Sequence, residues 1–216
     1  MKVSFALILV HVLCSSCAHQ TRIDGVQIYD HSIVRSQYNY SLQEGVPERI
    51  NQLLKLSLDY WNRHIGEPRL RFVDDASMSH VKLGYTEVST VHSVSSHTEM
   101  AGCLSGGNLL ADCRIQIDVP TIEALLAEMG KLAHLYSKGP LDAFLLKHID
   151  YDGDSRSYLH DKYVFITMIH EIGHSIGLGH AEDINCLMAE APLGQSTFCE
   201  SELNAVRRQL HLAGKD

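Results

Sequence analysis

The sequence predicts a single α+β domain. Apolar residues recur at helical spacing over residues 47–65, again over 158–176 and once more over 202–212. Between the first two of these runs, apolar and polar residues alternate at 80–85 and 114–119, as in strands with one buried face. With 216 residues, the chain is long enough to bury one substantial core and too short for two comfortable domains.

The composition is ordinary for a globular protein, with 45% hydrophobic and 20% charged residues. The formal net charge is −8 and Lys and Arg form no cluster, so we expect no nucleic-acid partner. Net charge affects solubility and steering and does not identify a substrate. We expect the protein to be a monomer.

Residues 1–18 read as an export signal. A basic start precedes an apolar run to Leu13 that is too short to span a bilayer as a mature helix. Cleavage after Ala18 would give a secreted protein. Alternatively, the residues before Cys17 resemble a bacterial lipobox, although Cys14 stands where an aliphatic residue is common. Either route predicts an extracytoplasmic protein, secreted or anchored in a bacterial envelope. Only the second route gives a membrane contact, through a lipid on Cys17.

An N-terminal segment of residues 19–45 precedes the main domain of residues 46–216. This segment is polar, and we expect it to form one edge strand at 26–29 or a loose leader. A long helix over 47–65 then opens the main domain, and Gly66 ends it. The apolar residues that define this helix are Ile50, Leu53, Leu54, Leu58, Trp61 and Ile65.

Strands are expected at 70–73, 80–85 and 114–119, where β-branched and aromatic residues alternate with polar ones. A helical segment follows at 121–149, which Gly139 and the proline after it divide into two helices. This segment carries no obvious chemistry, and we expect it to pack on the domain.

Three carboxylates alternate at Asp150, Asp152 and Asp154. Such spacing could gather oxygen ligands around a calcium ion. The glycine that follows Asp152 lies two positions earlier than the EF-hand loop requires, so an acidic turn is the alternative.

Four cysteines remain once the export signal is set aside: Cys103, Cys113, Cys186 and Cys199. An even number in an extracytoplasmic protein predicts disulfides, and four cysteines allow three pairings. Proximity favours Cys103 with Cys113 and Cys186 with Cys199, each worth about 3 kcal/mol if unstrained. Reduced, buried thiols are the alternative.

The helix expected at 158–176 carries His170 and His174. A spacing of four residues places both imidazoles on one face of the helix, where they can share a tetrahedral zinc ion. Gly177 and Gly179 can both adopt positive φ, which would end the helix and reverse the chain. The reversal returns His180 as a third ligand and leaves one coordination position open, as in catalytic zinc sites.

The sequence of residues 170–180, HEIGHSIGLGH, resembles the zinc motif of the metzincin peptidases and most closely its matrixin (matrix metalloproteinase) version. Met188 follows His180 at about the distance of the methionine in the matrixin Met-turn. The resemblance implies a metzincin catalytic domain: a twisted mixed sheet, a long first helix, an active-site helix, a Met-turn and a C-terminal helix. Residues 121–149 are then an insertion relative to the matrixin plan.

The resemblance implies a zinc endopeptidase that acts on proteins or peptides, with Glu171 as the general base beside the first ligand. An edge strand would hold the extended substrate. For this contact we favour residues 100–104, which are Met100, Ala101, Gly102, Cys103 and Leu104. The alternative is a latent or non-catalytic zinc-binding interaction module on a metzincin scaffold.

Overall fold

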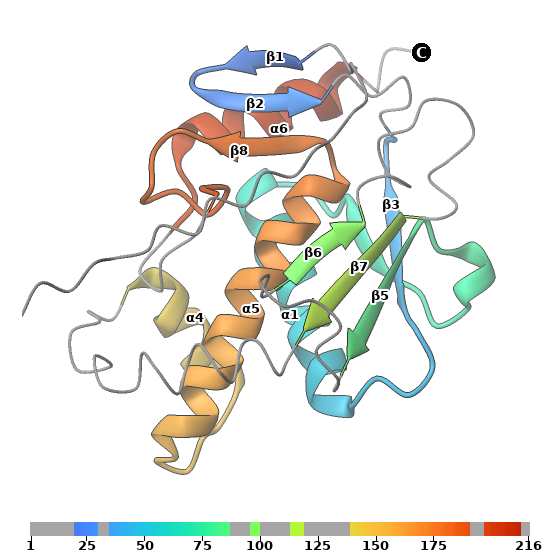
Figure 1. Ribbon diagram of the computed structural model, residues 1–216, viewed down its shortest axis with the longest axis vertical. Coiled ribbons are helices and arrows are strands. Elements are labelled where there is room, and N and C mark those ends of the chain that lie inside the picture. The colour runs from blue at the N-terminus through green and yellow to red at the C-terminus, as the bar shows by residue number, and fades with distance from the viewer. Residues whose placement is uncertain are drawn as a thin grey trace, which may run out of the picture.

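The computed structural model describes residues 20–29, 35–86, 96–99, 113–118, 139–190 and 197–212. In this part of the chain, a five-stranded sheet and a three-stranded sheet accompany four α-helices (Figure 1). The predicted α+β class is confirmed. None of the helices within these ranges is both long and apolar enough to cross a bilayer.

The five-stranded sheet is mixed and has the strand order β4-β3-β5-β7-β6. Four of its strands run parallel, and β6 pairs antiparallel with β7 at one end of the sheet. The three predicted strands are present, with ends shifted by about one residue, whereas β3 and β6 are additional. The strands are β3 (Tyr38–Leu42), β4 (Leu70–Phe72), β5 (Val81–Thr86), β6 (Ser96–Glu99) and β7 (Cys113–Asp118).

Helix α1 (Glu48–Ile65) packs against helix α5 (Ser155–Ser175). All six apolar residues that predicted α1 are buried, and Gly66 ends the helix in the left-handed conformation with φ of 89°. Trp61 lies between the two helices, where its Nε1–H donates to the carbonyl oxygen of Ile169 at 2.9 Å. A buried indole N–H needs such a partner, so this bond also fixes how the helices lie against each other.

The three-stranded sheet joins the N-terminal segment to the histidine motif. It has the order β1-β2-β8, with β1 (Gln20–Ile23), β2 (Val26–Tyr29) and β8 (Leu178–Ala181). The predicted strand at 26–29 is present, but it is the central strand of this sheet rather than an edge. The N-terminal segment therefore supports the strand on which His180 lies.

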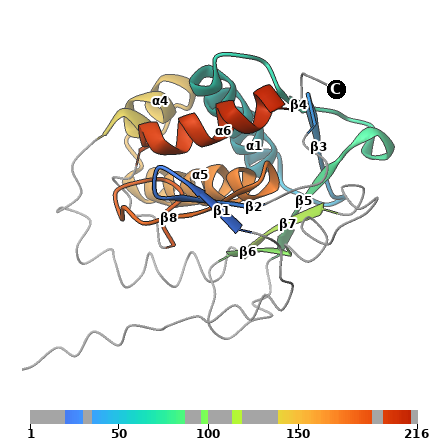
Figure 2. The ribbon, with the colours of Figure 1, turned by 90° about the horizontal axis from the view of Figure 1, so that it is seen from above.

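Helix α6 (Glu200–Leu212) packs against α1 and against strands β2 and β8 (Figure 2). Its apolar residues Leu203, Val206 and Leu210 are buried, as the helical spacing predicted. Helix α6 thus packs its apolar residues between α1 and the small sheet and adds them to the core beside the histidine motif.

Helix α4 (Pro140–His148) is the second of the two helices expected in the 121–149 insertion. It is joined to α5 by a buried ion pair, in which the Nζ of Lys162 lies 2.6 Å from a carboxylate oxygen of Asp142. Asp142 also accepts the backbone N–H of Gly139 at 2.6 Å. The expected packing of the insertion on the domain is confirmed for α4, while residues 121–138 lie outside the described part of the chain.

The expected calcium site at Asp150, Asp152 and Asp154 finds no support. Asp154 is the N-cap of α5 and accepts the backbone N–H of Arg156 at 3.0 Å, so the helix begins three residues earlier than expected. Asp150 accepts the backbone N–H of Asp152 at 3.1 Å. Two of the carboxylates therefore bind backbone groups of a turn and a helix start, and within the described chain the three do not gather as a metal-binding group.

Candidate metal centre

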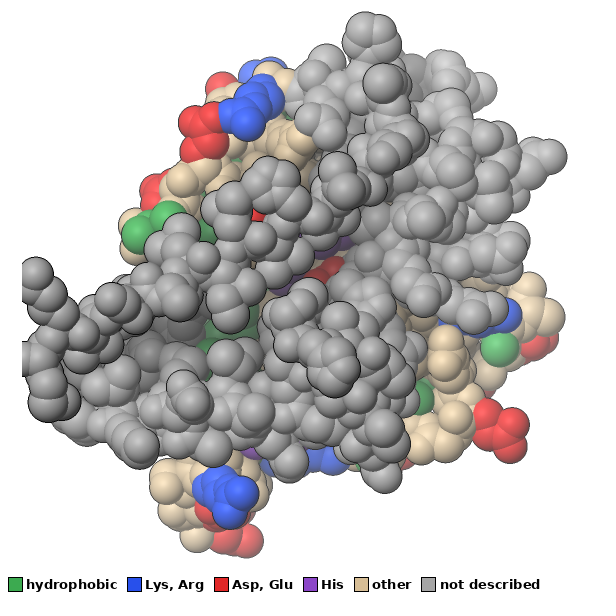
Figure 3. Space-filling view, in the orientation of Figure 1, with side chains coloured by type: hydrophobic (Ala, Val, Ile, Leu, Met, Phe, Trp, Pro, Cys, Tyr) green, Lys and Arg blue, Asp and Glu red, His purple; other side chains and the backbone are tan. Residues whose placement is uncertain are grey.

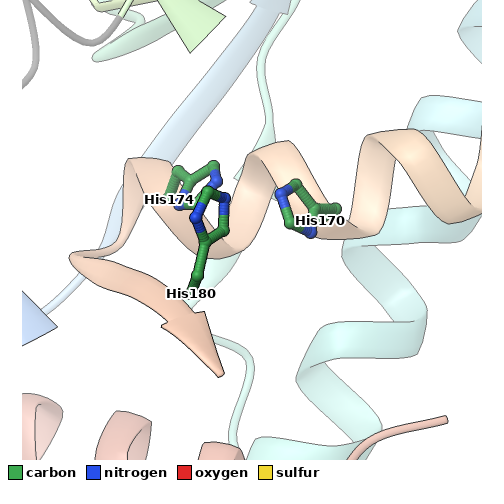
Figure 4. Close-up of side chains that lie close together, drawn as sticks. All are labelled: His170, His174 and His180. Carbon is green, nitrogen blue, oxygen red and sulfur yellow. The ribbon is translucent and has the colours of Figure 1, made fainter. Parts of the chain in front are cut away.

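His170 and His174, near the end of α5, lie together with His180 of β8 (Figure 4). One ring nitrogen from each residue lies within 4.8 Å of one from each of the others. The ring centroids are 4.5 Å apart for His170 and His174, 4.9 Å for His174 and His180, and 5.4 Å for His170 and His180. The predicted grouping of three histidines is therefore present.

The chain reversal that brings His180 back depends on one glycine rather than two. Helix α5 ends at Ser175, and Gly177 has a φ of 99°, which residues other than glycine rarely adopt. Gly179 does not have positive φ, contrary to our expectation, because it lies within strand β8. His180 therefore comes from a strand that is paired to β2, and not from a free turn.

Two of the histidines are held by backbone carbonyl groups. The Nδ1–H of His170 donates to the carbonyl oxygen of Leu187 at 2.8 Å, and that of His174 donates to the carbonyl oxygen of Leu178 at 2.8 Å. A carbonyl oxygen only accepts, so Nδ1 carries the proton in both rings. In a neutral imidazole the Nε2 lone pair then remains for a metal, which is the usual arrangement of histidine ligands.

The three rings are neutral at neutral pH. Burial lowers the pKa of His170 to about 4, although the bond to Leu187 opposes this shift. Burial, together with the other two histidines, lowers the pKa of His174 well below its ordinary value. Burial also lowers the pKa of His180. Neutral imidazole is the form that binds metal, so the donor set fits a zinc ion.

Glu171 follows His170 on α5 and is 4% exposed. Met188 is fully buried, and its Sδ and Cε fill the space beside Gly173, where an added Cβ would lie 2.9 Å from Cε. Gly173 lies between the two histidines of α5 in sequence, so Met188 packs directly against the helical turn that carries them. On the face seen in Figure 1, histidine and acidic side chains come into view near the middle of the molecule (Figure 3).

The segment around Met188 contacts both elements that carry the three histidines, helix α5 and strand β8. The Leu187 carbonyl holds His170, and the Met188 carbonyl accepts the backbone N–H of Ala181, next to His180, at 2.7 Å. The predicted disulfide between Cys186 and Cys199 is present and ties this segment to the start of α6. These cysteines and Asp183 form a second group of metal-ligand types, but bonded sulfurs offer no thiolate.

The remaining predicted site residues are the proposed substrate contact and the second cysteine pair. Residues 100–104, which include Cys103, lie outside the described part of the chain, directly after β6. Cys113 is the first residue of β7. The predicted substrate contact and the Cys103–Cys113 disulfide therefore stay predictions.

Sequence reasoning missed two residues that support this centre. Glu202 accepts the backbone N–H groups of Met188 and Cys199. A glutamate three residues after the residue that precedes a helix can bind the backbone N–H of that residue, so its place in the first turn of α6 was a weak signal. Gly173 makes room for Met188, and a glycine inside a helical pattern is itself a signal of close packing.

Gly179 is needed for close packing rather than for its φ angle. A Cβ at this position would lie 2.7 Å from the Cβ of Gln27 on the paired strand β2. We therefore expect Gly179→Ala to push β2 from β8, lower stability by about 1–3 kcal/mol and weaken zinc binding by moving His180. Thermal unfolding and zinc titration would measure both effects.

Gly139→Ala is the matched control, because a Cβ there would meet its nearest neighbour, Asp142, at an ordinary 3.6 Å. Adding Gln27→Gly to Gly179→Ala should restore zinc binding, since it removes the side-chain atoms that clash. Unchanged stability and zinc affinity in Gly179→Ala alone would show that the two strands do not need this close approach.

No protein-family model matches this chain, and no curated protein was found to match it. Among solved structures, archaemetzincin from Methanopyrus kandleri is similar over 82% of this chain and 97% of its own, with a TM-score of 0.47 and 14% identity. A chain in the GM1-bound form of the ECX AB5 holotoxin is similar over 88% of this chain and 87% of its own, with a TM-score of 0.52 and 12% identity. The second likeness concerns the fold alone, so the chemistry of the site depends on the site's own residues.

Proposed function

We propose that this protein is a zinc-dependent endopeptidase of the metzincin type, with a matrixin-like active site, that hydrolyses peptide bonds in proteins. The observation that carries the proposal is the grouping of His170, His174 and His180, with ring nitrogens within 4.8 Å of one another. Three histidines leave one position of a tetrahedral zinc open, as a catalytic site requires. The carbonyl partners of the first two rings support the same assignment, because they direct Nε2 toward a metal.

Zinc in this site would supply a Lewis acid that polarises the substrate carbonyl and lowers the pKa of a coordinated water to about 7. We assign the general base to Glu171, which is buried and follows the first ligand on α5. Its carboxylate takes a proton from the attacking water and then delivers that proton to the leaving amine. Met188 takes no part in proton transfer; it packs against α5 and supports the ligands.

The substrate is an extended peptide that lies along the edge of the five-stranded sheet. Among the described strands, β6 is the last of the sheet on this side, and it packs against α5, which carries two of the ligands. An edge strand has backbone N–H and C=O groups that an added strand can pair with. Residues 100–104 follow β6 directly, so we retain Met100 to Leu104 as the proposed substrate contact.

We also propose that the protein acts outside the cytoplasm. The Cys186–Cys199 disulfide supports this location, since such bonds persist in oxidising compartments. Release by a signal peptidase and attachment through a lipid on Cys17 both remain part of the proposal. Acyl labelling of the expressed chain would distinguish them, because only the lipoprotein carries the acyl groups.

The test is zinc analysis and hydrolysis of a quenched peptide library by the purified protein. We expect about one zinc per chain and cleavage that a chelator removes and added zinc restores. Zinc binding without cleavage of any library member or of casein would favour the alternative, a latent or non-catalytic zinc-binding module. A protein that binds no zinc would refute the assignment of the site.

A further inference from the structure

Glu202 is a fully buried carboxylate on the first turn of α6, with 0% of its surface exposed. One carboxylate oxygen accepts the backbone N–H of Cys199 at 2.8 Å, which is the capping bond expected three residues into a helix. The other accepts the backbone N–H of Met188, fourteen residues earlier in the chain. Helix capping explains the first bond and leaves the second to be explained.

The second bond reaches the metal centre through a single peptide group. The N–H of Met188 and the C=O of Leu187 belong to the same planar amide, so fixing one fixes the direction of the other. This C=O accepts the Nδ1–H of His170 at 2.8 Å. The chain of contacts therefore runs from the Glu202 carboxylate, across one peptide plane, to the imidazole of a ligand.

Such an arrangement affects both the position and the donor strength of His170. Hydrogen bonds in a chain polarise one another, so a carboxylate on the N–H side makes the C=O a stronger acceptor. A stronger acceptor on Nδ1–H makes Nε2 more basic, which is the effect of a carboxylate that contacts a ligating histidine directly. Here the peptide group stands between the carboxylate and the imidazole.

The cost of burying Glu202 indicates that a helix cap alone does not account for it. Burial raises the pKa of the Glu202 carboxyl to about 7, despite the N–H groups that favour its charged form. An exposed side chain could cap α6 without this cost. Glu200, on the same turn, shows how a glutamate avoids this cost: it is 73% exposed and pairs with Arg207 at the surface.

We propose that Glu202 is a positioning residue for the metal centre, which orients and polarises the Leu187–Met188 peptide so that this peptide holds His170 in its ligating position. The proposal rests on the proposed zinc site. The Cys186–Cys199 disulfide supports the same arrangement, because it joins the two segments whose N–H groups Glu202 binds.

The test compares Glu202→Gln with Glu200→Gln, a matched change on the same helical turn. Glutamine has one acceptor oxygen and an NH2 group, so it cannot accept both N–H groups. We expect Glu202→Gln to weaken zinc binding about 10-fold, the lower end of the range for outer partners of metal ligands. It should also shift the visible spectrum of the cobalt-substituted protein. Glu200→Gln should match the wild type in both.

Glu202→Asp separates positioning from capping. The shorter carboxylate can still cap α6 but cannot also reach Met188, so we expect weaker zinc binding with the thermal stability of the metal-free protein largely kept. Affinities are measured where circular dichroism shows each metal-free variant to be folded. Wild-type zinc affinity and an unchanged cobalt spectrum in both Glu202 variants would overturn the proposal. A wild-type protein that binds no zinc would instead refute the zinc site itself.

Discussion

Replacing Glu171 with glutamine is expected to lower peptide hydrolysis by about 10²- to 10⁴-fold, the usual contribution of a general base. Zinc should stay bound, because the change leaves His170, His174 and His180 in place. Glutamine keeps the size of the side chain and removes the group that accepts the proton. The measurement is zinc content together with kcat on the peptides that the wild type cleaves.

The control is Glu67→Gln, the same substitution at a surface residue that pairs with Arg69 beyond the end of α1. This variant should cleave at the wild-type rate. If Glu171→Gln retained full activity, another group would have to act as the base, although the zinc assignment would stand. If the variant lost its zinc, its inactivity would say nothing about proton transfer, and the proposed separation of base and ligands would be wrong.

The second large effect is expected from removal of a proposed ligand. It concerns zinc affinity rather than proton transfer. His174→Ala is expected to weaken zinc binding by more than about 100-fold, beyond the range known for outer-shell partners, and to abolish hydrolysis with it. Two histidines cannot complete the three-point site that holds a catalytic zinc. Competition with a chelator of known affinity, followed by activity at saturating zinc, would measure both losses.

His64→Ala provides a matched control. His64 lies on α1 and, like His174, directs Nδ1 at a backbone carbonyl, that of Tyr60 at 2.8 Å. Among the described residues, two groups bring metal-ligand atoms close together, and His64 belongs to neither of them. Its loss should therefore leave zinc affinity unchanged. Equal zinc affinity in His174→Ala and the wild type would contradict the assignment of the centre. Equal losses in both variants would point to general destabilisation instead.

Several parts of this protein are determined by local sequence. Helix α1 follows from apolar residues at helical spacing and from a glycine that ends it, and all six of those residues are buried. The grouping of His170 and His174 needs only the pitch of a helix. Gly177 ends this helix because glycine tolerates the φ of 99° found there. The Cys186–Cys199 disulfide follows from a short loop, since nearby cysteines meet most readily.

Other parts depend on residues far apart in the chain, and no local pattern contains them. Strand β2 reads as a weak edge strand, and only its pairing with β8 makes it the central strand of a sheet and a support for His180. Gly179 reads as a turn residue, but the nearness of Gln27 explains why a glycine stands there. The sequence left Asp154 as either a calcium ligand or part of an acidic turn, yet it caps α5, because the start of the helix lies three residues earlier than the apolar spacing suggests.

The sequence alone therefore predicted the three histidines and the proposed base, because these residues lie within eleven positions of the chain. Helical spacing relates those on α5, and one chain reversal at Gly177 returns His180. Only the tertiary structure decided what supports the histidines. Leu187, Met188 and Glu202 reach the centre from later in the chain, through hydrogen bonds between backbone and side-chain groups. Each of these bonds has a backbone atom as one partner, so the residue type at that position does not reveal it.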